Sequence, residues 1–246
     1  MSLARLVPLL PCIALIGCGG ATHAATAPVH HAAPASAAPA AIRIPGGSGH
    51  LAAMAPKAGL ILRDKPGGRV IAHLRPKTDW GSPTVVWARK RRGNWLGVVA
   101  TALPNNKVGW LDIRHDHPRM WRSALTLEAD LSKRSLELRR GSKVVVRIPV
   151  TIGGPSSPTP VGRFTVTDKL IPTQGVAYYG CCLLALSGHQ PNLRPGWAGG
   201  DRIAIHGSPT GQVGAAASGG CLRALDKDLK RLMKIVPVGT PVVIRA

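Results

Sequence analysis

Residues 203–223 carry the stretch that decides the fold of this 246-residue sequence: Ile203-Ala204-Ile205-His206-Gly207-Ser208 and, after nine residues, Ser218-Gly219-Gly220-Cys221-Leu222-Arg223. The cysteine follows two glycines, so backbone can approach a ligand closely and no bulky neighbour hides the thiol. Exposed N–H groups in such a turn can point toward a developing oxyanion. A histidine at a strand end can be the base that a cysteine nucleophile needs. On spacing alone, an inert buried cysteine and a strand-ending histidine are the commoner interpretation.

Three further segments give these residues a context. They are Gly153-Gly154 with Pro158-Thr159-Pro160-Val161-Gly162-Arg163-Phe164, then Ala185-Leu186-Ser187, then Val236-Pro237-Val238-Gly239-Thr240-Pro241-Val242. In this order, all the segments resemble the L,D-transpeptidase catalytic domain of the YkuD type. Its signature has a histidine–glycine pair, a gap of about a dozen residues, then Ser-His-Gly-Cys and an Arg or Asn two beyond. The resemblance covers essentially the whole second domain.

The resemblance implies a reaction on peptidoglycan stem peptides. Cys221 would attack the carbonyl of the third residue of a tetrapeptide stem and expel the terminal D-Ala, with His206 as acid and base. An amine of a neighbouring stem would then open the thioester, without any cofactor or metal. Arg223 would bind the stem carboxylate or form a salt bridge within the fold. The candidate residues for oxyanion and substrate binding are Gly220, Ser218, Gly219, Ser208, Gly207 and Arg223.

One position departs from the family pattern, and two alternative functions stay open. Gly219 stands where the family usually has histidine, which removes a possible second imidazole. The chain could therefore be a non-catalytic, lipid-anchored wall-binding protein, although both Cys221 and His206 are retained. An L,D-carboxypeptidase, in which water opens the thioester, is the alternative within enzymes.

The pattern of apolar residues predicts a mainly β protein of two domains. Between residues 59 and 117, short β-like runs alternate with turn signals such as Asp64-Lys65-Pro66-Gly67-Gly68, which is typical of a small barrel and resembles a bacterial SH3-like domain. Residues 123–246 would form the catalytic domain, a β-sandwich by the resemblance. Only Asp226 to Val236 has helical periodicity, so we expect one late helix.

The first residues predict export. An apolar run from Leu6 to Ile16 suits a secretory signal, and Leu15-Ile16-Gly17-Cys18 resembles the lipobox of bacterial lipoproteins. We therefore expect residues 1–17 to be a signal peptide, Cys18 to be lipidated, and the protein to face the cell wall from a membrane anchor. Residues 18–58 are rich in Ala and Pro and predict a disordered tether.

Charge and cysteine content narrow the partners. The formal net charge is +21, but no nucleic-acid motif accompanies it, so we expect attraction to anionic wall polymers and headgroups rather than nucleic acid. Of the five cysteines, Cys12 lies in the signal and Cys18 at its end. The other three, Cys181, Cys182 and Cys221, are an odd number, so at least one free thiol is expected. Adjacent cysteines also lack the spacing of zinc ligands.

Overall fold

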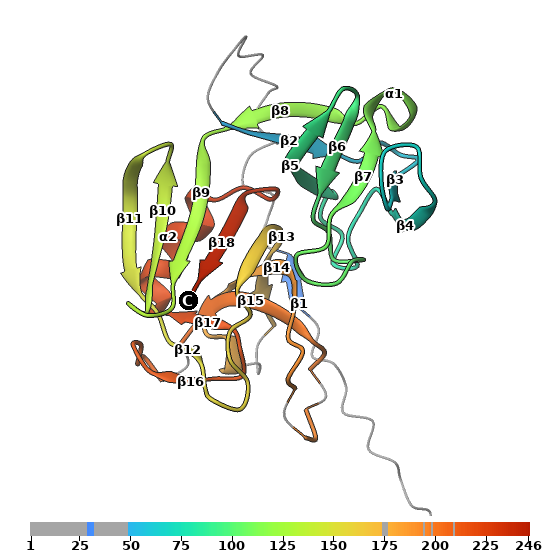
Figure 1. Cartoon of the computed structure of the whole chain (residues 1–246). Helices are drawn as coiled ribbons and strands as arrows, with labels where there is room; N and C mark the ends of the chain where they lie inside the picture. Colours follow the sequence, from blue (N-terminus) through green and yellow to red (C-terminus); the bar gives the residue numbers. More distant parts are fainter. Residues whose placement is uncertain (1–28, 32–48, 174–176, 194, 198, 209) are drawn as a thin grey trace, which may run out of the picture.

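The computed structural model describes residues 29–31, 49–173, 177–193, 195–197, 199–208 and 210–246. Two large β-sheets contain most of the regular secondary structure, and Figure 1 shows them side by side, the N-terminal one in blue to green. The predicted mainly β fold with one late helix is confirmed. Within the described ranges, no helix has the length and apolar character needed to cross a membrane.

The N-terminal sheet has seven strands in the order β4-β3-β7-β6-β5-β2-β8. Leu60, Leu62, Leu96 and Leu111 are almost completely buried in its core, and they come from the short apolar runs of the sequence. The SH3-like identity of this unit remains a prediction. The elements are β2 (His50–Met54), β3 (Leu60–Arg63), β4 (Val70–Leu74), β5 (Val85–Arg92), β6 (Trp95–Val98), β7 (Gly109–Asp112), a short helix α1 (Ile113–Asp116) and β8 (Arg119–Ser123).

The second sheet has nine strands in the order β11-β10-β9-β18-β13-β14-β15-β17, with β1 also paired to β13. The strands are β1 (Val29–His31), β9 (Leu125–Asp130), β10 (Ser135–Arg140), β11 (Lys143–Pro149), β13 (Gly162–Pro172), β14 (Leu183–His189), β15 (Arg202–Gly207), β17 (Leu222–Ala224) and β18 (Pro241–Arg245). A separate ladder joins β12 (Ile152–Gly153) to β16 (Ala216–Ser218) in parallel. Helix α2 (Asp226–Ile235) buries Leu229, Leu232 and Met233 against this core, and η1 (Ala177–Tyr179) is a single 3₁₀ turn.

The tether predicted for residues 18–58 is too long. β1 and β2 both fall inside it, and β2 lies between β5 and β8 in the first sheet. The alanines of β2 made this stretch look like linker, but Ala53 is completely buried because its side chain packs into the apolar core of the N-terminal sheet. The first sheet also ends at Ser123, in β8, beyond the limit of 117 expected for the N-terminal domain.

The two sheets are joined by hydrogen bonds that are buried or partly buried. The indole N–H of Trp87 donates to the Phe164 carbonyl at 2.9 Å. The Asn105 side chain donates to the His189 carbonyl at 2.7 Å and accepts from the His189 N–H at 2.9 Å. A further bond links His50 Nε2 and Thr126 Oγ1 at 2.7 Å. Because buried polar groups cost free energy when unpaired, these bonds hold the N-terminal sheet against β13 and β14.

Candidate active site

The candidate nucleophile and base lie on one face of two paired strands. β15 and β17 are parallel, with Ile205 opposite Leu222 and His206 opposite Arg223. Ile205 and Leu222 belong to the main apolar core, so the alternating partners on both strands face the other way. Cys221 directly precedes β17 and therefore lies one diagonal step from His206 on that outer face.

His206 is fully buried and oriented by its own backbone. Its Nδ1 is 2.7 Å from the Gly207 carbonyl oxygen. Because a carbonyl only accepts, Nδ1 carries the proton and Nε2 presents a lone pair. Nε2 is buried and has no hydrogen-bond partner among the described residues. The rings of Tyr178 and Tyr179 pack against the imidazole, with centroids 5.7 and 5.2 Å away.

The surroundings keep both groups uncharged at neutral pH. Burial, reinforced by the nearby positive charge of Arg223, lowers the pKa of His206 from 6.5 to about 4. Burial raises the pKa of the Cys221 thiol, although a backbone hydrogen bond with Ala204 and the charge of Arg223 act in the opposite direction. The resting pair is therefore thiol and imidazole rather than thiolate and imidazolium, and the thiol must lose its proton as it reacts.

Ser218 and Ser208 hold loops. The Ser218 hydroxyl donates to the Cys221 carbonyl at 2.6 Å and accepts from the Gly220 N–H at 3.1 Å, which closes the turn before β17. The Ser208 hydroxyl donates to the Gln212 carbonyl at 2.7 Å. These contacts give both serines a role in shaping the backbone beside the site, while the sequence made them candidates for oxyanion and substrate binding.

The glycines of the site differ in what they allow. Gly220 has a φ of 114°, and a Cβ there would collide with the Gln190 side chain, so both conformation and space require glycine. A Cβ at Gly207 would collide with Asp226, because α2 begins immediately beside it. At Gly219, by contrast, a Cβ would meet nothing within 4 Å. The departure from the family pattern therefore lies at an open position.

Gln190 is a buried residue of the site that the sequence did not reveal. Its amide nitrogen contacts the carbonyls of Pro158 and Gly219 at 3.0 Å and that of Ser157 at 3.3 Å, and its oxygen accepts from the Asn192 N–H at 3.0 Å. One side chain thus ties the Gly/Pro-rich loop, the end of β14 and the nucleophile turn together. Nothing in the local pattern distinguishes this glutamine from a solvated one in a turn.

We expect Gln190→Leu to lower the free energy of unfolding by about 2–4 kcal/mol, because several buried carbonyls lose their donor. Acylation of Cys221 should slow as well, since the turn that carries it loses an anchor. Urea unfolding and single-turnover kinetics measure the two effects. Gln190→Glu is the matched control for shape, because it keeps the volume and removes the donor. Wild-type stability in both variants would contradict this role.

A pocket of about 140 Å³ opens beside Cys221, and we call it the catalytic pocket. Its wall includes Tyr178, Trp197, Arg202 and Arg223. The Arg223 guanidinium lies over the Tyr178 ring at 5.2 Å and donates to the Tyr178 hydroxyl at 3.0 Å. Its Nε is buried without a hydrogen-bond partner among the described residues, which also show no salt bridge to Arg223. Arg223 therefore keeps one unpaired guanidinium donor beside the catalytic pocket, although this Nε is buried from solvent in the structure.

The two other described cysteines are free thiols. Cys182 packs into the main core, and Cys181 Sγ lies 3.5 Å from the Asp226 carbonyl at the start of α2. Of these three cysteines, Cys221 lines the catalytic pocket, and Cys181 and Cys182 do not.

Comparisons with known proteins place this site in a family. A family model described as the YkuD L,D-transpeptidase catalytic domain matches residues 125–244. Among solved structures, the chain is similar to L,D-transpeptidase 3 from Mycobacterium tuberculosis in complex with a faropenem-derived adduct, with 17% identity over 56% of this chain and 73% of that one and a TM-score of 0.41. No curated protein is significantly similar in sequence.

Two other solved structures are similar over different extents. An L,D-transpeptidase from Mycobacterium smegmatis shares 17% identity over 80% of this chain and 82% of its own, with a TM-score of 0.40. The catalytic domain of the E. faecium L,D-transpeptidase shares 22% identity over 49% of this chain and 96% of its own, with a TM-score of 0.36.

Proposed function

Residues 125–244 belong to the YkuD family of L,D-transpeptidase catalytic domains, and on this basis we propose that the chain cross-links peptidoglycan through a thioester on Cys221. The observation that carries the proposal is the position of Cys221 and His206 on one face of β15 and β17, with the Nε2 lone pair of His206 unpartnered among the described residues. A nucleophile and a base with a free lone pair on neighbouring strands are what acyl transfer by a thiol requires.

Acylation begins with proton transfer from the thiol to His206 Nε2. The sulfur attacks the carbonyl of the third stem residue, and a C–S bond forms while the carbonyl oxygen takes up negative charge. The imidazolium then returns the proton to the nitrogen of the terminal D-Ala as the C–N bond breaks. The depressed pKa of His206 supports this second step, because a weakly basic imidazole gives up its proton readily.

The developing oxyanion would be stabilised by backbone N–H groups of the turn at Gly220 and Cys221. The Gly220 N–H donates to the Ser218 hydroxyl in this structure, so it would have to exchange that bond for the substrate oxygen. The Ser218 contacts fix the backbone of the turn, so apart from this exchange of partner the donors would keep their positions. Arg223 would bind a stem carboxylate through its unpartnered Nε.

In the second half of the reaction, an amine of a neighbouring stem attacks the thioester. His206 takes the proton from this amine, the C–S bond breaks, and the thiol is regenerated. Water in place of the amine would make the chain an L,D-carboxypeptidase. The open rim beside Trp197 and Tyr178 supports access by a second chain, since both side chains are more than one-third exposed.

Mass spectrometry of the chain with a tetrapeptide muropeptide tests the proposal. The expected result is an adduct on Cys221 with release of D-Ala, followed by transfer when an amine-bearing stem is added. Release of free tripeptide alone in the presence of that amine would indicate the carboxypeptidase. A chain that never forms the adduct would favour the non-catalytic wall-binding protein.

We expect Gly219→His to retain acylation activity or raise it. Position 219 has room for a side chain, and its backbone is outside the conformations reserved for glycine. Gly220→Ala is the control: it faces the Gln190 side chain at a positive φ and should lose activity. Single-turnover acylation of the two variants measures the difference, and inactivation by Gly219→His alone would contradict the argument.

We also propose that the chain is an exported lipoprotein anchored through Cys18, which lies outside the described residues. The supporting observation is the sequence Leu15-Ile16-Gly17-Cys18 after an apolar run. Cys18→Ser should abolish fatty-acid incorporation and leave an uncleaved or differently processed precursor. Metabolic labelling with a fatty acid measures this, and an unlabelled wild-type protein would overturn it.

A further inference from the structure

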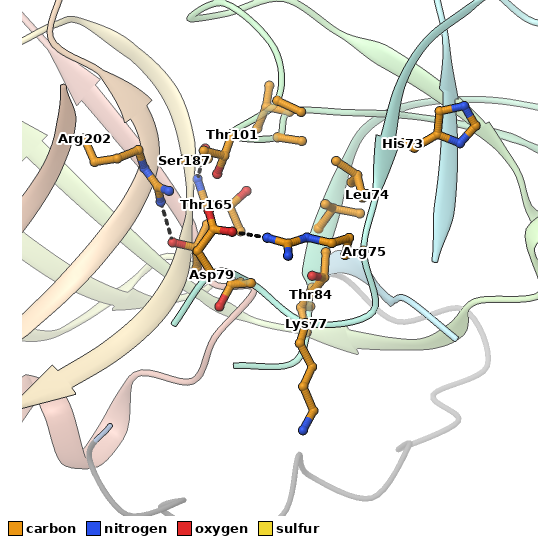
Figure 2. Close-up of a pocket in the computed structure, with 17 residues that line it drawn as sticks. His73, Leu74, Arg75, Lys77, Asp79, Thr84, Thr101, Thr165, Ser187 and Arg202 are labelled. Atoms are coloured by element: carbon orange, nitrogen blue, oxygen red, sulfur yellow. Dashed lines mark hydrogen bonds and ion pairs between the residues drawn. The ribbon is translucent and has the colours of Figure 1, made fainter. Parts of the chain in front are cut away.

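A second cavity, of about 230 Å³, lies between the two sheets, and we call it the interdomain pocket (Figure 2). One wall comes from the end of β4 and the loop after it, the start of β5 and the segment that follows β6, and the opposite wall comes from β13, β14 and β15. The cavity is smaller than the ~300–1,000 Å³ of sites for drug-sized ligands, so it suits a single ring or a short side chain.

Hydroxyl groups gather inside the interdomain pocket. Thr165 is only 1% exposed, so water cannot satisfy its hydroxyl. Its Oγ1 has no hydrogen-bond partner among the described residues. The Ser187 hydroxyl beside it accepts from the Thr165 N–H at 3.0 Å, a bond that does not use the hydroxyl proton. Buried hydroxyls are costly when unpaired. The hydroxyls of Thr84 and Thr101 also line the cavity, so both domains contribute donors and acceptors.

The charged groups around the pocket face carboxylates or point outward, and for Arg202 these carboxylates are Asp168, Asp201 and Asp79. Arg75 pairs with Asp79, and Figure 2 shows Lys77 pointing away from the hydroxyls. Arg202 donates to the Leu186 carbonyl and to Thr167 Oγ1, both at 2.8 Å. The interior is therefore polar but close to neutral, which favours an uncharged ligand with several hydroxyl or amide groups over a phosphate.

Apolar side chains complete the lining. Val85, Val86 and Val99 are nearly fully buried, and all three line the cavity. A wall of hydrocarbon next to a group of hydroxyls matches a pyranose, whose ring carbons form an apolar face and whose edge carries hydrogen-bonding groups.

Arg202 connects this pocket with the catalytic pocket, because it lines both cavities. Its guanidinium lies over the Trp80 ring at 5.1 Å, so a residue of the N-terminal sheet fixes the wall between them. The Arg202 side chain thus separates a ligand bound beside Thr165 from the catalytic pocket that contains Cys221.

We infer that the interdomain pocket binds an N-acetylated sugar of the glycan strand that carries the stem peptide. The inference rests on the proposed function for the identity of the sugar, and it gives the N-terminal sheet a direct part in selecting the acyl donor. A stem peptide attached to its sugar would then bind in both the interdomain pocket and the catalytic pocket, whereas a free tetrapeptide would bind only in the catalytic pocket.

The test compares two acyl donors, a disaccharide-tetrapeptide and the free tetrapeptide, on the full chain. We expect the wild type to prefer the disaccharide form. Thr165→Val removes the unpartnered hydroxyl at constant shape and should reduce that preference about three- to tenfold, with no loss of Tm. Ala102→Phe, at an exposed position on the rim, should block the cavity and abolish the preference. Free tetrapeptide should acylate all these proteins at similar rates.

Thr126→Val is the matched control, because it also removes an interdomain threonine hydroxyl but lies outside both pockets. It should keep the wild-type preference. Equal acylation of the wild type by both donors, or a preference that Ala102→Phe leaves intact, would overturn the inference while leaving the proposed function in place. If neither donor acylates Cys221, the proposed function fails. Calorimetric titration with the free disaccharide then tests sugar binding in the interdomain pocket. Binding to the wild type and none to Ala102→Phe would support the inference, and equal heats for both proteins would overturn it.

Discussion

Cys221→Ala is expected to abolish the acyl-enzyme completely, the largest effect of any single substitution in this protein. Without the thiol no C–S bond can form, and the neighbouring hydroxyls of Ser218 and Ser208 are engaged in holding loops. Intact-mass spectrometry after incubation with a tetrapeptide muropeptide measures the result. The variant should fold normally, because alanine leaves only a small gap beside the catalytic pocket.

The cysteines near β14 provide the control. Cys181→Ala and Cys182→Ala should each keep the adduct, although Cys182→Ala should lower stability because Cys182 packs into the main core. An adduct that survives in Cys221→Ala and disappears in the double variant at 181 and 182 would move the nucleophile to the other side of β15. That result would remove the assignment of Cys221.

His206→Ala is expected to slow acylation by about two to four orders of magnitude, the usual contribution of a positioned general base. No described histidine stands ready to replace it: the nearest in this domain by sequence, His189, has both ring nitrogens bonded, to Asp201 Oδ2 at 2.8 Å and to the Thr101 carbonyl at 2.7 Å. Single-turnover acylation rates measure the loss. A His206→Ala protein as fast as wild type would mean that backbone dipoles alone ionise Cys221.

The pH dependence provides a second measurement on the same base. His206 accepts a proton only when neutral, so acylation requires pH above its pKa. Because burial lowers that pKa to about 4, the rate should persist as pH falls through 6.5 and be lost only as pH approaches 4. An ordinary solvated imidazole would instead give a loss centred near 6.5. A midpoint there would contradict the buried, neutral base.

The sequence predicted well those features that local pattern determines. Alternating apolar residues identified many strands of both sheets, although not β1, β2 or β8, and the helical periodicity from Asp226 to Val236 predicted a helix that the structure has from Asp226 to Ile235. The pairing of Cys221 with His206 across a glycine-rich gap came from the family resemblance, since spacing alone favoured inert residues. The structure adds the parallel register of β15 and β17, which supports this predicted pairing.

Features that depend on residues far apart in the sequence could not be predicted. β2 looks like linker because its alanines are small. Only its position between β5 and β8 shows that these alanines are buried in a sheet. Gln190 anchors the nucleophile turn through carbonyls 29 to 33 residues away, so no window of sequence contains the interaction. The interdomain pocket likewise needs Thr165 and the loop after β4 to meet, which depends on how the two sheets pack.

With the lipid anchor proposed at Cys18, the pairing of β1 with β13 would limit how far the catalytic domain lies from the membrane. Val29 lies opposite Pro172, so the chain is fastened to the catalytic domain eleven residues after Cys18. Eleven extended residues reach at most about 40 Å, whereas a leash that ran from Cys18 to β2 would reach about 110 Å. A lipid on Cys18 would therefore confine cross-linking to the layer of wall closest to the bilayer. Glycan strands farther out would lie beyond the reach of the tethered catalytic domain.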